Sequence, residues 1–237
     1  MAWPSDETIW PQVSLHTWKY AVRKEPVRLI LLHSTRGDNT MELQYQATKN
    51  WQISPNNKSP DGTWGSISSR IISHQGQLCV SLPDEYYPTW SGGHMDPIAI
   101  SYELAQPTDS TPFTEACLER AALEVAKDCL RFNIPAVMLP FVSGDNHEAP
   151  GICRHDHTAN GLKWGKSDPG KMFDNRAFEA RVKKNMEAPM PKILTPEEAL
   201  KYNAQSAFHL NDSRDLGKIA TVIQYIYRVK GWPWPAA

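Results

Sequence analysis

The feature that most constrains this fold is a short, largely apolar segment that ends in a histidine. Residues 27–32 read VRLILL, and His33 and the turn-rich run STRGDN follow directly. A leucine-rich run of this length with β-branched residues is typical of a buried central strand in an α/β sheet. Such sheets hold their ligand sites at the carboxyl ends of central strands, so His33 stands where a functional side chain is expected. Taken alone, a histidine here is as readily a satisfied polar residue as a ligand.

Predicted strands and helices alternate along the first three quarters of the chain. Residues 53–66, 83–97 and 143–173 are expected to be loops, and a loop as long as the last is usually functional in a compact domain. The alternation predicts the α/β class, with helices around a central sheet. We expect helices at 40–51 (capped by Asn39 or Thr40), 114–132 and 174–186, strands at 98–104 and 136–142, and a hairpin joining 69–73 to 77–82 around Gly76.

The composition is that of an ordinary globular protein and excludes several kinds of partner. Lys and Arg total 25 against 26 Asp and Glu, a net charge of -1, so nothing indicates a nucleic-acid partner. No apolar run approaches the roughly 18 residues of a membrane span, and the first ten residues lack the pattern of a signal peptide. We therefore expect a monomer that is made in the cytoplasm and has no membrane partner.

The four cysteines include no CxxC pair and are expected to be free and buried.

Residues 151–170, GICRHDHTANGLKWGKSDPG, contain a second set of possible metal ligands. Imidazoles and a carboxylate suit a borderline-soft ion, above all Zn²⁺. His33, His155 and Asp168 would supply three ligands and leave a fourth position open, which is the arrangement of a catalytic zinc. His157 could replace His155, and the residues alone leave that choice open.

The predicted strand at 98–104 carries a carboxylate on its less bulky face. Ala99, Ser101 and Glu103 alternate with larger apolar residues, so space remains above Glu103 for a ligand. A zinc hydrolase needs a group that takes a proton from water and returns it to the leaving nitrogen, and Glu103 is suited to that role. The alternative is an ordinary exposed acid on a strand.

Taken together, these residues resemble the amidase-2 family of N-acetylmuramoyl-L-alanine amidases. The family includes many phage endolysins and is related to peptidoglycan recognition proteins. The resemblance lies in the histidine that ends LILLHS, the glutamate of IAISYEL and the run GICRH…KSDPG, and it covers roughly residues 25–178. It implies a mostly parallel or mixed central sheet surrounded by helices, and peptidoglycan as the substrate.

The resemblance also implies roles for individual residues. His33, His155 and Asp168 correspond to the zinc ligands, and the GICRH context favours His155 over His157. Glu103 corresponds to the catalytic acid, and Lys166 corresponds to a basic residue that stabilises the oxyanion. Trp90 and His94 lie where the family lines its substrate groove. Trp90 could equally be a packing residue, as could Trp164 between the metal ligands.

The chain departs from the family pattern in three places. A polar aromatic residue, usually Tyr, is absent, and Ser68, Ser69 and Arg70 occupy that stretch. The segment between His155 and Asp168 is longer than in many members. The third departure is the chain beyond residue 180, which resembles nothing in the family.

We predict a catalytic domain at 1–179 and a helical extension at 180–237 that docks on it. Two helices are expected in the extension, one starting at the capping box of 195–198 and one at 213–229. The second has an apolar stripe that must be buried against something. The alternative is a free cell-wall-binding module, which the short, Pro-rich run EAPMPK at 187–192 disfavours.

Three functions remain in competition at this point. The first is a zinc amidase that cuts peptidoglycan between the lactyl group and L-alanine, as a phage lysin that reaches the wall after release from the host cytoplasm. The second is a cytoplasmic amidase acting on anhydro-muropeptides. The third is a binding module of the recognition-protein type, which commonly lacks a metal ligand, most often at the position of Asp168. The presence of all three candidate ligands and Glu103 favours an enzyme.

Overall fold

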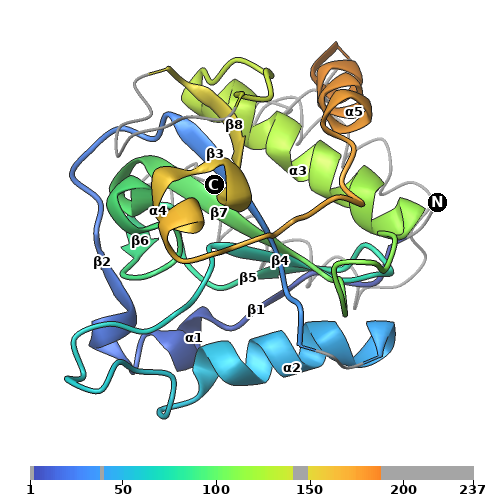
Figure 1. Ribbon diagram of the computed structural model, residues 1–237. Helices are drawn as coiled ribbons and strands as arrows, with labels where there is room; N and C mark the ends of the chain where they lie inside the picture. The colour runs from blue at the N-terminus through green and yellow to red at the C-terminus, as the bar shows by residue number, and fades with distance from the viewer. Residues whose placement is uncertain (1–2, 38–39, 141–148, 188–237) are drawn as a thin grey trace, which may run out of the picture. The chain divides into compact units, whose positions relative to one another are not determined.

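The computed structural model describes residues 3–37, 40–140 and 149–187, shown as coloured ribbon in Figure 1. The helices predicted after residue 188 and their docking on the catalytic domain lie outside the described residues. Helix α5 (Asn175–Glu187) spans the predicted domain boundary at residue 179. The division of the chain into 1–179 and 180–237 therefore stays a prediction.

A mixed sheet of six strands is the centre of the described part of the chain. Its order is β1-β5-β4-β7-β3-β8, and β3 pairs in parallel with both β7 and β8. Strand β4 is parallel to β7 and antiparallel to β5, which makes the sheet mixed, as predicted. The strands are β1 (Glu7–Thr8), β3 (Leu29–Ser34), β4 (Arg70–Ile72), β5 (Leu78–Val80), β7 (Ala99–Leu104) and β8 (Gly151–Arg154). A separate antiparallel pair consists of β2 (Tyr20–Val22) and β6 (Tyr86–Pro88).

Helices cover both faces of this sheet (Figure 1). Helices α3 (Glu115–Phe132) and α5 pack against each other and bury one face of the sheet. Helices α1 (Trp10–Val13) and α2 (Met41–Ile53) pack on the opposite face, over β4 and β5. The part of that second face above β3, β7 and β8 is covered by loops and short helical turns, and the candidate site lies between them and the strands.

Burial explains why β3 lies in the middle. All six of its residues are buried, and alternate side chains enter the cores on the two faces of the sheet. Ile30 and Leu32 pack under α3, whereas Leu29 and Leu31 face the loops. Each fully buried aliphatic side chain of this size contributes roughly 1.5–3 kcal/mol. Helix α3 is fixed at its start by Thr114, whose hydroxyl accepts the Cys117 N–H.

The structure confirms most of the predicted elements. The helices at 40–51, 114–132 and 174–186, the strand at 98–104 and the hairpin around Gly76 all form within a few residues of the predicted bounds. All four cysteines are buried and free, as predicted. Among the helices that the structure describes, none has the length and apolar character needed to cross a membrane.

Three predictions about loops and strands were wrong. Residues 83–97 contain β6 and the helical turn η2 (Gly93–Ile98), and the predicted loop at 143–173 contains β8, η3 (His155–His157) and α4 (Ala159–Lys163). In the described part of the predicted strand at 136–142, the structure has one isolated bridge, between Met138 and Ile152. The four residues of β8 show no alternation, and they form a strand because they pair with β3, far away in the sequence.

Two glycines with nearly the same backbone conformation provide a test of this packing. Gly76 has φ +78, and a Cβ there would lie 2.5 Å from the Trp3 ring and 2.9 Å from the Ala116 carbonyl oxygen. Gly62 has φ +74, with nothing within 4 Å of a Cβ. We expect Gly62→Ala to cost about 1–2 kcal/mol for the left-handed conformation alone. Gly76→Ala should cost roughly 1–3 kcal/mol more because of overpacking. Urea unfolding measures both, and equal losses would contradict the packing of this hairpin on α3.

Candidate active site

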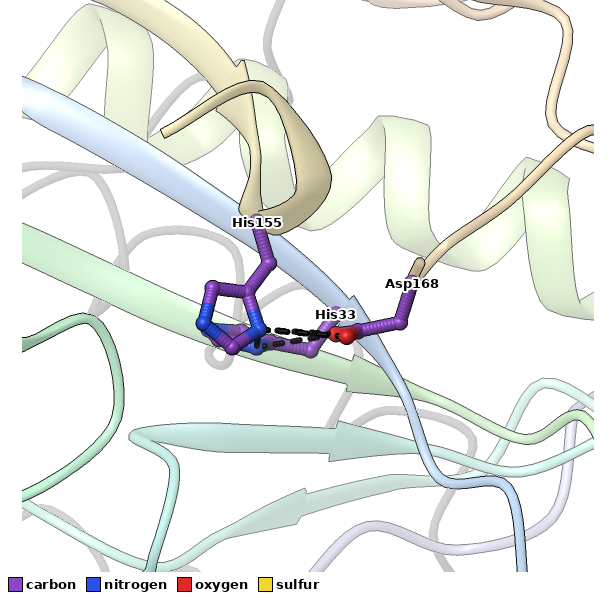
Figure 2. Close-up of side chains that lie close together, drawn as sticks. All are labelled: His33, His155 and Asp168. Atoms are coloured by element: carbon purple, nitrogen blue, oxygen red, sulfur yellow. Dashed lines mark hydrogen bonds and ion pairs between the residues drawn. The ribbon is translucent and has the colours of Figure 1, made fainter. Parts of the chain in front are cut away.

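Two imidazoles and one carboxylate converge above the ends of β3 and β8 (Figure 2). His33 Nδ1 lies 3.0 Å from His155 Nδ1 and 3.2 Å from Asp168 Oδ2. His155 Nδ1 lies 3.2 Å and 3.1 Å from the two Asp168 oxygens. All three residues are buried. In the described part of the chain, this is the group with potential ligand atoms close enough together to hold a metal ion.

The strand pairing brings these side chains together. His33 is the fifth residue of β3, and His155 directly follows β8, the parallel neighbour of β3. Asp168 lies in the loop after α4, and its carbonyl accepts the N–H of Asp156, next to His155. The third ligand candidate is therefore fastened to the segment that carries the second.

Arg36 holds the same loop from the other side. Its guanidinium donates to the Ser167 carbonyl at 2.7 Å and to Asp109 Oδ1 at 2.9 Å. A Cβ at Gly170 would lie 2.1 Å from that Asp109 oxygen, so glycine leaves the space that the ion pair occupies. Arg36 thereby ties the loop that carries Asp168 to the end of β3.

The charges of the cluster suit a cation. Burial opposes ionisation of Asp168, but hydrogen bonds with His155 and His33 outweigh it and hold the pKa of Asp168 well below its usual range. Burial, together with the neighbouring His155, lowers the pKa of His33 to about 4. At neutral pH the cluster therefore contains an ionised carboxylate and a neutral His33 imidazole, the protonation states that metal ligands require.

The geometry also fits a tetrahedral ion. Ligand atoms 2.0–2.1 Å from zinc at tetrahedral angles are about 3.3 Å apart, close to the 3.0–3.2 Å separations seen here. Only one hydrogen can lie between the Nδ1 atoms of His33 and His155, and the ionised Asp168 carboxylate can only accept hydrogen bonds. A cation at the centre of the three groups would bind the lone pairs of both Nδ1 atoms and of the carboxylate at once. His33, His155 and Asp168 therefore fit a metal site.

Glu103 lies beside this cluster on the same face of the sheet. It is the register partner of His33 across the parallel pair β3 and β7, so the two side chains leave the sheet in the same direction. Its Oε2 is buried and has no hydrogen-bond partner among the described residues. Burial raises the pKa of Glu103 to about 8, and the negative charge of Asp168 adds to the effect. A carboxyl group with a raised pKa and a free oxygen can exchange protons near neutral pH.

A cavity of about 680 Å³ opens above the cluster and Glu103. Lys166 is exposed and contributes to its lining, as do Trp90 and Trp164. Trp64 also lines the cavity and stacks on Trp90, and Trp164 lies tilted against the Trp90 ring, with a centroid distance of 4.6 Å in both pairs. We refer to these three residues as the Trp wall.

Other residues singled out in the sequence lie outside this arrangement. His94 is exposed in η2 and is not part of the cavity lining. His157 is two residues beyond His155 and does not belong to the converging group. In the stretch without the family aromatic residue, Ser69 bonds to Ser101, and Arg70 pairs with Asp84. Neither side chain lines the cavity.

Sequence reasoning missed Ser91, Arg36 and Trp64. Ser91 lies in a loop, with its Oγ 3.2 Å from His33 Nε2. Arg36 stands in the turn-rich run STRGDN after His33, and its positive φ of 38 is visible only in the structure. Trp64 is distant in sequence from its stacking partners, and only the tertiary structure brings the rings together.

A metal site with three protein ligands, an adjacent carboxylate and an open cavity is characteristic of metal-dependent hydrolases. The sequence profile of the amidase-2 family, described as N-acetylmuramoyl-L-alanine amidase, matches residues 23–171. The chain belongs to this family and is an enzyme of the peptidoglycan amidase class.

Solved structures with the same fold are distant in sequence. A selenomethionine derivative of AmpD is 18% identical with a TM-score of 0.51, over 75% of this chain and 94% of that one. Hydrolase AmiA of Staphylococcus aureus, solved with its ligand, is 15% identical with a TM-score of 0.51, over 78% and 85%. A mutant endolysin from Bacillus subtilis is 13% identical with a TM-score of 0.50, over 76% and 99%. At these identities the likeness concerns the fold. A search of curated protein sequences returned no match.

The two histidines of η3 should differ sharply in metal binding. His155→Ala removes one of three converging ligands, so we expect the affinity for Zn²⁺ to fall by more than the 10–100-fold that loss of a ligand's hydrogen-bond partner costs. His157→Ala should leave the affinity within a few-fold of wild type. Competition with a chromogenic chelator measures both. Loss of binding in His157→Ala with retention in His155→Ala would reverse the assignment.

Proposed function

We propose that the enzyme binds one zinc ion through His33, His155 and Asp168 and cleaves the amide between the lactyl group of N-acetylmuramic acid and L-alanine. The observation that carries this proposal is the convergence of the three side chains beside Glu103 in an open cavity. Two imidazoles and a carboxylate are a common ligand set of hydrolytic zinc, with one position left for water or substrate.

The proposed roles follow from what each group can do at its position. Zinc, when bound, supplies Lewis acidity that makes water a stronger acid and polarises the carbonyl. Glu103 accepts a proton from the attacking water at its free Oε2. The water oxygen forms a bond to the lactyl carbonyl carbon, and the carbon–nitrogen bond then breaks. Glu103 returns the proton to the alanine nitrogen, so that the products are a lactyl carboxylate and a free amine.

Lys166 is proposed to stabilise the charge that develops during attack. Lys166 is exposed and contributes to the cavity lining, two residues before Asp168. The Lys166 N–H donates to the Gly161 carbonyl at 2.7 Å, which fixes the backbone from which the side chain extends. A positive charge fixed near the carbonyl oxygen lowers the energy of the oxyanion more than that of the substrate.

The Trp wall is proposed to bind substrate together with the metal site. Trp90 and Trp164 line the same cavity as the metal cluster, and Trp64 extends the aromatic surface. Flat indole surfaces suit the apolar faces of pyranose rings, so this side of the cavity fits the glycan part of peptidoglycan. His94 lies outside the lining, and a contact between it and substrate would require a longer glycan that extends beyond the cavity.

Among the sources of such an enzyme, we favour a phage lysin that acts on the wall after release from the cytoplasm. The support is the Trp-lined cavity beside the metal cluster, which fits the glycan part of the wall. The fold is shared with a Bacillus subtilis endolysin and with AmpD alike, so it does not separate the two candidate functions. The competing function is a cytoplasmic amidase for soluble anhydro-muropeptides. Initial rates on intact sacculi and on soluble anhydro-muropeptides separate the two, because a lysin prefers the first. A protein that binds both without releasing free amine would instead be a binding module.

Glu103→Gln tests the proposed acid–base role. The amide keeps the shape of the side chain but cannot exchange a proton, so turnover should fall about 10²–10⁴-fold. Zinc content should stay at the wild-type level, because Glu103 is not among the converging ligands. Release of free amines from sacculi measures turnover. Glu42→Gln, at an exposed position on α2, is the matched control and should keep wild-type activity. Near-normal turnover in Glu103→Gln would remove this residue from the mechanism.

Lys166→Ala tests the oxyanion role. We expect kcat to fall about 10²–10³-fold, the usual effect of deleting an oxyanion donor. Lys163→Ala is the control, since Lys163 is also exposed, lies three residues away and does not line the cavity. If both variants lose activity equally, the effect belongs to the charge of the loop and not to a contact with the reacting carbonyl.

A further inference from the structure

Ser91 contacts the ring nitrogen of His33 that does not face the metal cluster. Its Oγ lies 3.2 Å from His33 Nε2, on the opposite side of the ring from the Nδ1 that meets His155 and Asp168. A neutral imidazole has one N–H and one lone pair, so the partner of one nitrogen decides what the other can do. The contact at Nε2 therefore bears directly on whether Nδ1 is free to bind a metal.

Ser91 is itself held in place by a buried carboxylate. Asp96 is 2% exposed, and its Oδ2 accepts the Ser91 N–H at 3.0 Å while its Oδ1 accepts the Gly92 N–H at 2.6 Å. Both bonds go to the backbone, so they fix where the Ser91 side chain begins and leave its hydroxyl group available to His33.

The same loop lies tightly against β3. A Cβ at Gly92 would lie 2.3 Å from Leu31 Cδ2, and Leu31 is two residues before His33 on the same face of the strand. The absence of a side chain at Gly92 lets the backbone approach the strand this closely. Asp96 and Gly92 thus position Ser91 from two directions. The Asp96 carboxylate bonds to the backbone of this loop and not to His33, His155 or Asp168.

We propose that Ser91 is a positioning residue for the metal site: its hydroxyl oxygen accepts the Nε2–H of His33, which fixes the tautomer with a free lone pair on Nδ1. The reverse arrangement, with Ser91 donating to Nε2, would leave the proton on Nδ1, and a protonated Nδ1 has no lone pair with which to bind the ion. Hydrogen-bond partners of this kind orient ligand histidines and raise their basicity. This inference rests on the proposed metal function of His33.

The first test measures metal affinity and does not depend on catalysis. Metal-stripped protein is titrated with Zn²⁺ in competition with a chromogenic chelator. Ser91→Ala should weaken binding about 10–100-fold, the range found when such partners of ligand histidines are removed. Ser91→Thr retains a hydroxyl group and should recover most of the affinity. Ser66→Ala is the matched control, because Ser66 lines the same cavity and its side chain has no hydrogen bond to the cluster.

The second test reads the tautomer of His33 in the wild-type protein and therefore does not depend on how any variant folds. Long-range ¹H–¹⁵N correlation spectra of the metal-stripped protein should show a protonated Nε2 and an unprotonated Nδ1 on His33, because the contact with Ser91 is present without the ion. A protonated Nδ1 would overturn the inference, as would unchanged zinc affinity in Ser91→Ala alongside tight wild-type binding. If the wild-type protein binds no zinc, the proposed function itself fails, which is a different result.

Discussion

The parallel pairing of β3 with both of its neighbours is the interaction on which the rest of this structure depends. Because β3 is buried on both faces, its register is set by the packing of its apolar side chains, and a shift by one residue would move all of them to the wrong face. That register places His33 opposite Glu103 on β7, and it places the end of β8, with His155, at the same edge of the sheet. Hydrophobic packing along β3 thus determines the position of the chemical groups.

Around this pairing, the fold uses backbone contacts and ion pairs to hold loops that have little apolar surface of their own. Arg36 and Asp109 fasten the segment that carries Asp168, and Asp96 fastens the segment that carries Ser91. Burying a polar or charged group costs free energy unless the group forms a hydrogen bond or an ion pair, and most of the buried polar groups around the site do so. The buried Oε2 of Glu103 is an exception, and it belongs to the group that we propose exchanges protons during the reaction.

The sequence revealed those parts of the site that depend on local patterns. His33 was predictable because a buried apolar strand ends at it, and Glu103 because small residues share its face of β7. The sequence context favoured His155 over His157, but the proximity of His155 to His33 and Asp168 is visible only in the structure, since it depends on how η3 turns after β8. Strand β8 was missed because four residues carry no periodicity and form a strand only through β3. Contacts made by loops, such as those of Ser91 and Trp64, have no local signal at all.

The converging side chains lie far apart in the sequence, and this has a thermodynamic consequence. His33 is 122 residues from His155 and 135 from Asp168. Any ion held by all three groups ties the ends of a long stretch of chain together, and the unfolded chain cannot reproduce that geometry. Occupancy of the cluster therefore adds to the free energy of unfolding, by about 2.7 kcal/mol at a free ion concentration 100 times Kd. The ion would thus act as a reversible cross-link, and the resistance of the enzyme to heat and proteolysis would depend on the supply of metal in its surroundings.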